Sequence, residues 1–181
     1  MTDAPRPAPT TPWDHTVTVS QLAPETALML EPSADTRAAL ARHVGALEVP
    51  ELKATLDLVA DRRGDVEMTG RLTGRIVQAC VVTLEPVEAL IDEEVAVRFS
   101  ADARPVEAES GAEIDISAEA EDLPEPIIGG RIDLGAILTE FFSLAVDPYP
   151  RKPGATWQSP ADAEARDTPF AALTKLRSPG P

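Results

Sequence analysis

The sequence predicts an α+β protein with a curved, mainly antiparallel sheet, open or barrel-like, covered by one long amphipathic helix and shorter helices. Three observations predict this class. About six or seven segments with alternating apolar residues follow one another along the chain. Strands in such sequential order favour antiparallel pairing over a parallel α/β sheet. The strongest helical repeat of apolar residues lies over residues 133–146.

Alternating apolar and polar residues predict the individual strands. They are expected over residues 13–22, 26–30, 47–60, 65–86, 88–100 and 112–118. The sequence RRGD over residues 62–65 is expected to join the third and fourth strands as a hairpin. A loop over residues 101–110 and a proline- and glycine-containing connection over residues 119–130 are expected on either side of the last strand.

The segment over residues 65–86 is the longest that favours an extended backbone, and we expect it at the centre of the sheet. Gly70 and Gly74 interrupt it, which indicates a bulge or a sharp bend, so we expect either one long, curved strand or two strands joined by a kink at Gly74. Cys80 lies within this predicted strand. Pro86 is expected to end it because proline cannot donate to a sheet ladder.

A first helix is expected over residues 35–44, between the second and third strands. Ser33 or Asp35 would be its N-cap, since a short oxygen-bearing side chain can accept from the first backbone N–H groups. Gly45 would be its C-cap, because glycine adopts the left-handed conformation that ends many helices.

The helix over residues 133–146 would begin at Asp133 as N-cap and stop before Pro148. Its apolar residues are spaced by three and four, so they share one face. That face is predicted to consist of Leu134, Ile137, Leu138, Phe141, Leu144 and Ala145. We expect the helix to cover one face or one mouth of the sheet.

Residues 13–146 are predicted to form a single α+β domain, with a disordered arm over residues 1–12 and a proline-rich segment over residues 147–181. Within that segment, residues 169–176 are predicted to form a short amphipathic helix. This helix would either dock on the domain or be presented to a partner.

The composition favours a cytoplasmic protein with basic partners and no membrane contact. No run of about 18 apolar residues is present, and the N-terminal residues lack the apolar segment of a secretory signal. The formal net charge is −15, and residues 85–126 alone hold 14 acidic and 2 basic side chains. Such a surface repels phosphate and attracts basic proteins.

The sequence holds no recognisable nucleotide-binding, hydrolase or metalloprotease motif, and we expect a protein that is not an enzyme and has no cofactor. His15 and His43 are isolated, whereas a zinc site needs about four converging nitrogen or sulfur ligands. Cys80 has apolar neighbours and an acidic segment downstream, which predicts a raised pKa for its thiol. The enzymatic alternative would use Cys80 as a nucleophile.

The acidic excess over residues 85–126 suggests a docking surface for a basic protein, and a merely solvated acidic face is the alternative. The candidate docking residues are Asp92, Glu93, Glu94, Glu107, Glu109, Glu113 and Asp115. The carboxylates do not follow the spacing of a calcium-binding loop, so no metal ligands are predicted among them.

Direct RNA binding is the competing interpretation. The candidate contacts are Arg62, Arg63, Arg71, Arg75 and Arg151. Arg71 and Arg75 are four residues apart and would lie on the same face of a strand. A few arginines can contact phosphates despite the overall charge, although a charge-balanced, solvated face explains the same pattern.

Three stretches together resemble the YceD family of large ribosomal RNA subunit accumulation proteins. They are CVVTLEPV over residues 80–87, IDLGAILTEFFSLAVDPYPRKPG over residues 132–154 and PFAALTKL over residues 169–176. The family-motif positions are Cys80, Leu84, Pro86, Asp133, Leu134, Pro148 and Phe170. The resemblance covers roughly residues 13–177, in the form seen in alphaproteobacteria.

One departure from the family pattern concerns metal binding. Many members have a second cysteine in the strand and a further cysteine pair after the helix, which could form a zinc site. Here Thr83 stands at the second strand position, and PRKPG over residues 150–154 contains no cysteine. A metal site is therefore not carried over to this chain.

The resemblance implies a role in the accumulation of large-subunit rRNA, hence in ribosome biogenesis, without known enzymatic chemistry. The expected partner is a basic ribosomal protein or assembly factor, held by the acidic face. The alternative is direct binding of large-subunit pre-rRNA through the arginines of the central strand.

Overall fold

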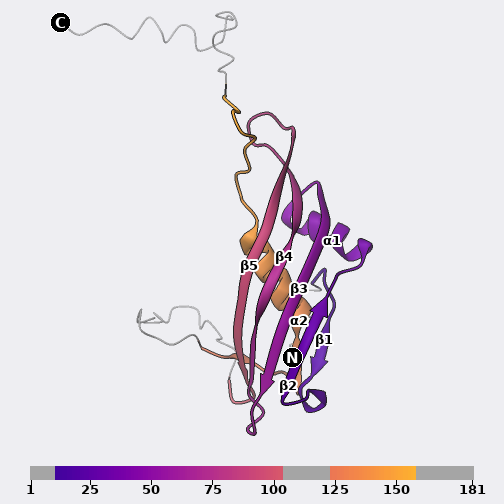
Figure 1. Ribbon diagram of the computed structural model, residues 1–181, viewed down its shortest axis with the longest axis vertical. Helices are drawn as coiled ribbons and strands as arrows, with labels where there is room; N and C mark the ends of the chain where they lie inside the picture. The colour runs from indigo at the N-terminus through magenta and orange to yellow at the C-terminus, as the bar shows by residue number, and fades with distance from the viewer. Residues whose placement is uncertain (1–10, 104–122, 158–181) are drawn as a thin grey trace, which may run out of the picture.

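The computed structural model describes residues 11–103 and 123–157. Its strands are β1 (Thr16–Thr18), β2 (Glu25–Leu30), β3 (Glu48–Ala60), β4 (Val66–Ala79), β5 (Pro86–Ser100), β6 (Glu125–Pro126) and β7 (Arg131–Asp133). A five-stranded sheet has the order β2-β3-β4-β5-β6, and β1 pairs with β7 in a second sheet (Figure 1). All pairs are antiparallel except β5 with β6. The mainly antiparallel sheet is confirmed, and it is open rather than a closed barrel.

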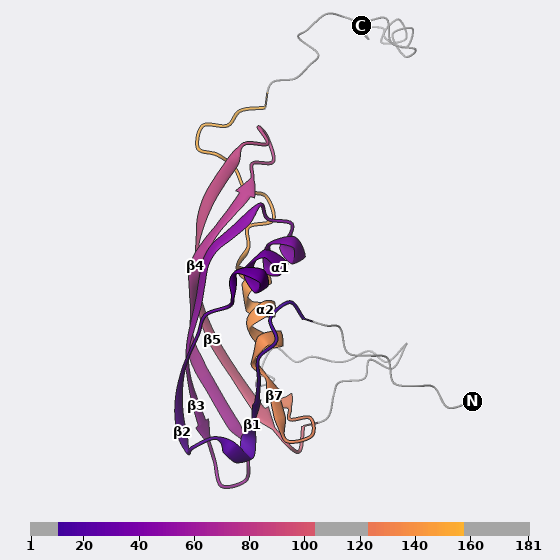
Figure 2. The same ribbon diagram turned by 90° about the vertical axis from the view of Figure 1, so that its right-hand side faces the viewer.

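Two helices, α1 (Ala34–Val44) and α2 (Leu134–Ala145), lie on the same face of the five-stranded sheet (Figure 2). We call this the inner face, and the opposite one the outer face. No helix or strand in residues 11–103 and 123–157 covers the outer face (Figures 1 and 2). None of the described helices is long and apolar enough to cross a membrane.

The core lies between the inner face and the two helices, and it follows from strict alternation along the long strands. From Leu52 in β3 and along the whole of β4 and β5, every second residue faces inward and is buried or half-buried. The core residues of these strands and of α2 include Leu52, Leu56, Leu58, Val66, Met68, Leu72, Ile76, Ile91, Val95, Phe99, Leu134, Leu138 and Phe142. Each fully buried aliphatic or Phe side chain contributes about 1.5–3 kcal/mol, so this aliphatic core stabilises the fold.

Both helix starts follow the capping chemistry that the sequence predicts. The Ser33 hydroxyl accepts from the Thr36 backbone N–H at 3.2 Å, and Gly45 ends α1 with a φ of 70°. The Asp133 carboxylate accepts from the Ala136 backbone N–H at 3.0 Å and caps α2. Side-chain caps of this kind contribute about 1 kcal/mol each.

The predicted apolar face of α2 is only partly right. The helix has twelve residues, and it contacts the sheet through Leu134, Leu138 and Phe142, which are spaced by four. Leu144, expected on the buried face, is 78% exposed. Ile137, Phe141 and Ala145 are partly buried against the core, so Leu144 is the one member of the predicted face that is exposed.

The first strand is much shorter than residues 13–22. After β1 the chain forms a 3₁₀ turn over Val19–Gln21, because the Leu22 backbone N–H bonds to the Val19 carbonyl. Trp13 precedes the strand and is buried. β1 pairs with β7 rather than with the five-stranded sheet.

The central strand differs from its prediction at its C-terminal end. β4 ends at Ala79, the chain turns over residues 80–85, and Pro86 opens β5 opposite Ala79. Proline is tolerated there because its missing N–H faces away from β4. Pro86 therefore begins a strand instead of ending one.

β4 is one long strand, as the first alternative predicts, and the bulge or kink at Gly70 and Gly74 is wrong, since β4 pairs with β5 in unbroken register along its whole length. The glycines are needed for close approach instead. A Cβ on Gly74 would lie 2.5 Å from the Glu51 carbonyl oxygen, and one on Gly70 would lie 2.9 Å from the Leu56 Cα. Because Gly70 and Gly74 have no Cβ atom, the backbone of β3 can lie close to β4 at these two positions.

Other expectations fall on parts of the chain that the structure does not describe. The predicted strand over residues 112–118, most of the loop over residues 101–110, the arm over residues 1–10 and the helix over residues 169–176 lie outside the described residues. In the expected connection over residues 119–130, β6 extends the sheet and Ile128 bridges to Arg131.

Candidate docking surface on the sheet

The acidic triplet of β5 is divided between the two faces of the sheet. Ile91 and Val95 of β5 are buried in the core. Glu93, two residues from each, shares their inward side, and Asp92 and Glu94 lie exposed on the outer face. The structure therefore brings together only two of the three neighbouring carboxylates that sequence analysis grouped.

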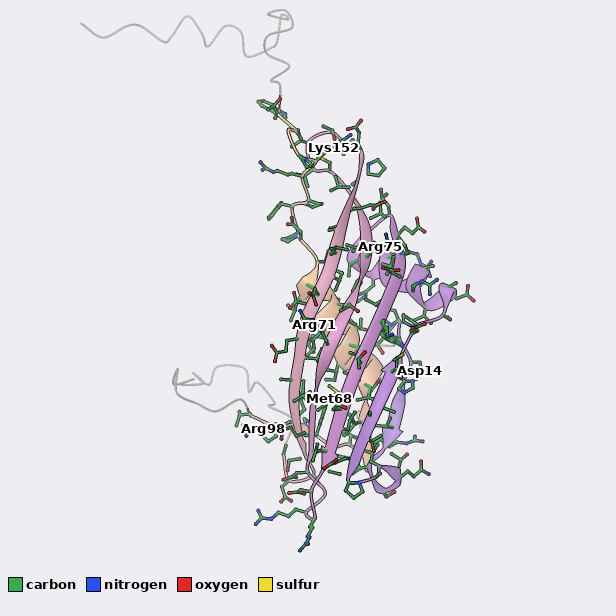
Figure 3. All side chains as sticks on the ribbon, in the orientation of Figure 1. Asp14, Met68, Arg71, Arg75, Arg98 and Lys152 are labelled. Atoms are coloured by element: carbon green, nitrogen blue, oxygen red, sulfur yellow. The ribbon has the colours of Figure 1, made fainter. Side chains whose placement is uncertain are left out.

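Asp92 is paired with one of the candidate RNA-binding arginines. The Arg71 guanidinium lies on β4 (Figure 3). It donates to both carboxylate oxygens of Asp92, and the Nη2–Oδ2 distance is 2.8 Å. These hydrogen bonds lower the pKa of Asp92 and raise that of Arg71. Both side chains are more than half exposed, so the pair contributes little to stability. Its consequence is that each neutralises the other's charge.

Arg75 is held in the same way on the outer face. Its Nε donates to Glu51 Oε1 of β3 at 3.0 Å, and this hydrogen bond raises the pKa of Arg75. The other three candidate arginines lie elsewhere. Arg62 and Arg63 are in the β3–β4 turn, and Arg151 lies between Pro150 and Lys152, which contact the turn at the opposite end of β4. The five arginines therefore do not form one basic surface.

Two exposed carboxylates on the outer face of β5 have no ion-pair partner among residues 11–103 and 123–157. They are Glu88 and Glu94, which lie opposite Val77 and Arg71 in the β4–β5 register. Glu88 is not among the candidates predicted from the sequence, because those candidates are acidic residues close together in the chain. The alternation of β5 places Glu88 on the same face as Asp92 and Glu94. Glu107, Glu109, Glu113 and Asp115 lie outside the described residues.

Two of the stretches that carry the family resemblance, the turn over residues 80–85 and the segment after α2, meet at the end of β4. The turn after Cys80 contacts the segment after α2, since the Val81 backbone N–H bonds to the Pro150 carbonyl at 2.9 Å. Lys152 Nζ bonds to Glu85 Oε2 at 2.8 Å. Nearby, the buried Gln78 donates to the Asp147 carbonyl at 2.9 Å. These contacts fix the C-terminal end of α2 against the sheet.

The remaining motif positions have structural roles or lie on the surface. Asp133 caps α2 and Leu134 is fully buried at its first turn. Leu84 is 78% exposed and has a φ of 62°, an unfavourable conformation for a residue with a Cβ. Pro148 is exposed after α2. Phe170 is outside the described part of the chain.

Cys80 is completely buried, and its sulfur accepts hydrogen bonds from backbone N–H groups. Sγ lies 3.4 Å from the amide nitrogens of Val82 and Lys152 and 3.5 Å from that of Thr83. Together with a hydrogen bond from the Thr83 hydroxyl, these bonds lower the pKa of the thiol from 9.0 to about 6. The Lys152 amide has the largest effect on the pKa, and the Thr83 hydroxyl has the second largest. The predicted upward shift is wrong because the Lys152 amide, 72 residues away, outweighs burial.

The residues around Cys80 do not fit a zinc ion. The sulfur is contacted by the backbone N–H groups of Val82, Thr83 and Lys152 and by the Thr83 hydroxyl, whereas a structural zinc site needs about four nitrogen or sulfur ligands. Within the described ranges, no group of three His, Cys, Asp or Glu side chains could hold a metal. The Cys80 sulfur instead accepts hydrogen bonds from backbone N–H groups.

The lowered pKa of Cys80 predicts a pH-dependent stability. Because the unfolded thiol titrates near 9.0 and the folded one near 6, the folded state binds fewer protons between these values. The free energy of unfolding should therefore rise with pH over this interval, and this contribution should be lost as the pH falls through about 6. Urea unfolding across the interval measures it. Cys80→Ser should have a flatter slope, and an unchanged slope would contradict a stabilised thiolate.

The comparisons with known proteins give one match. A family model described as "Large ribosomal RNA subunit accumulation protein YceD" matches residues 68–177, which begin in β4 and include β5, α2 and the Cys80 turn. No curated protein and no solved structure matches the chain.

Proposed function

Because the chain belongs to the YceD family of large ribosomal RNA subunit accumulation proteins, we propose that it is a non-enzymatic ribosome biogenesis factor of the cytoplasm. It supports the accumulation of large-subunit rRNA by binding a basic ribosomal or RNA-processing protein. The binding surface is the outer face of β5, with Glu88 and Glu94 as its principal charges.

The observation that carries this proposal is the pair of exposed carboxylates, Glu88 and Glu94, which form no ion pair within the described residues and lie on a sheet face that no described element covers. Asp92 lies between Glu88 and Glu94 on the same face and is already bound by Arg71. Along the sequence, residues 85–126, which include these three, hold 14 acidic and 2 basic side chains. Like charges would repel rRNA phosphates, whereas a basic protein would be attracted and steered.

The geometry does not favour direct RNA binding as a second function. Arg71 and Arg75 are each bound to a carboxylate on the outer face. An RNA phosphate would have to displace Asp92 or Glu51 before it could contact either guanidinium. Nor does the site favour covalent catalysis, since the Cys80 sulfur has no exposed surface from which to attack a substrate.

Complementation of a strain that lacks this protein tests the proposal. The measured quantity is the ratio of large-subunit to small-subunit rRNA. We expect the wild-type chain to restore the ratio and the double variant Glu88→Lys/Glu94→Lys to leave it near the level of the deletion strain, since reversed charges repel a basic partner. These positions are chosen because reversal of Asp92 would also release Arg71.

The matched control reverses two exposed carboxylates away from β5, in Glu25→Lys/Glu140→Lys. It changes the net charge by the same amount and should restore the ratio fully. Equal restoration by both double variants would contradict docking at β5. A deletion strain with an unchanged rRNA ratio would contradict the role in rRNA accumulation itself.

A further inference from the structure

β5 is an edge strand over most of its length. It pairs with β4 from Pro86 to Phe99, but on its other side β6 pairs only with Phe99 and Ser100. No strand of the described residues pairs with that side from Pro86 to Arg98, and Figure 1 shows β5 at the open margin of the sheet. An exposed strand edge presents unpaired N–H and C=O groups that can bind another chain.

Hydrogen bonds at the two ends of β5 identify the residues whose backbone faces the open edge. At the start, the Cys80 N–H bonds to the Glu85 carbonyl at 2.9 Å, so odd-numbered residues of this strand bond to β4. At the end, the Ser100 carbonyl accepts from the Ile127 N–H at 3.1 Å, so even-numbered residues point away from β4. The backbone groups at the open edge are those of Glu88, Leu90, Asp92, Glu94, Ala96 and Arg98.

These residues also place their side chains on the outer face. Glu88, Asp92 and Glu94 therefore lie in one row beside the unpaired backbone groups. A strand added at this edge would carry every second side chain next to that row, because strands in a sheet share the same alternation. Lysine or arginine side chains placed beside Glu88, Asp92 and Glu94 would match their charges.

The charges argue against two other occupants of the edge. Residues 104–122 of this chain contain seven acidic residues and one basic residue, so like charges oppose their pairing with β5. A second copy would bring the same strand against itself, with three carboxylates and only one basic side chain, Arg98, on this face. Like charges placed opposite one another on neighbouring strands are destabilising.

We propose that the open edge of β5 binds an extended, basic segment of the partner protein as an added strand. This inference rests on the proposed function and specifies how the partner is held: backbone hydrogen bonds supply affinity, and the acidic row selects alternating basic side chains. If the partner were held by charge attraction alone, its segment would not have to be extended, and the unpaired N–H groups of β5 would not contribute to binding.

Proline at Ala96 separates strand addition from charge attraction. Ala96 is exposed and even-numbered, opposite Thr69. Proline there removes an N–H that faces the open edge, leaves the β4 ladder intact and changes no charge. Ala96→Val is the matched control, since it keeps the N–H and favours a strand.

The probe is a short synthetic peptide that alternates lysine and valine, titrated into the full-length protein. We expect the dissociation constant of Ala96→Pro to be about tenfold or more above that of Ala96→Val, because an edge hydrogen bond is lost and the ring obstructs pairing. Both variants should be checked for the wild-type circular dichroism spectrum. An acidic peptide that alternates glutamate and valine should not bind.

Amide hydrogen exchange of the wild-type protein tests the same inference without a substitution. Addition of the lysine–valine peptide should slow exchange at Leu90, Asp92, Glu94 and Ala96, whereas Ile91 and Val95 already bond to β4 and should change little. The alternation of affected residues is the signature of strand addition.

Each contrary result has a distinct meaning. Equal affinity of Ala96→Pro and Ala96→Val, with weaker binding by Glu88→Lys/Glu94→Lys, would overturn strand addition and leave acidic docking standing. No binding by the wild type would overturn both. Slow exchange at the even-numbered amides before any peptide is added would show an edge already occupied by this chain or a second copy, and would overturn the inference.

Discussion

Replacing Gly135 with alanine is expected to lower the free energy of unfolding by about 3 kcal/mol. A Cβ at this first turn of α2 would lie 2.7 Å from the Trp13 carbonyl carbon and 2.8 Å from the His15 nitrogen. The Gly135 N–H also bonds to the His15 carbonyl at 3.0 Å. The added methyl would have to push the chain before β1 away from α2 and withdraw Trp13 from the core.

Urea unfolding followed by circular dichroism measures this effect, and its sign is informative. In an unobstructed helix a glycine-to-alanine change stabilises by about 1 kcal/mol. The control Ala136→Gly, in the same turn, should cost only about that amount. A Gly135→Ala protein as stable as the wild type would show that residues 13–15 do not cross α2 as closely as the structure has them.

Replacing Gly70 with alanine is expected to cost about 2–3 kcal/mol. The Cβ would meet the Thr55 carbonyl oxygen and would lie 2.9 Å from the Leu56 Cα, in the backbone of β3. Backbone atoms cannot rotate away as a flexible side chain can, so β3 and β4 would have to separate. The expected change is a lower midpoint in urea with a similar slope.

The control for Gly70→Ala is Thr69→Ala, one residue away on the exposed outer face. It should change the free energy of unfolding by less than about 1 kcal/mol. If Gly70→Ala instead stabilised the protein, as expected where glycine is merely flexible, the close approach of β3 and β4 would be contradicted.

The local elements of this fold could be predicted from the sequence, since their signals lie within a few residues. The Ser33 cap, the Gly45 stop and the strand alternation after Leu52 need no distant partner. The role of Gly70 and Gly74 could not be predicted in this way. Glycine in a strand signals either a bulge or a close backbone approach, and the β3–β4 pairing decides between them.

The candidate site shows the same division between local and distant information. The separation of Glu93 from Asp92 and Glu94 follows from alternation and could have been predicted. The Arg71–Asp92 pair joins two strands and depends on their register. The low pKa of Cys80 depends on Lys152, which no local pattern places at the sulfur.

Affinity capture of the tagged protein from growing cells, split and washed with or without RNase, tests docking of a basic protein most directly. We expect a basic ribosomal or assembly protein to remain bound after RNase, and to be lost with Glu88→Lys/Glu94→Lys but not with Glu25→Lys/Glu140→Lys. Release of all large-subunit proteins by RNase would show that RNA forms the bridge, and would contradict a protein-docking surface on β5.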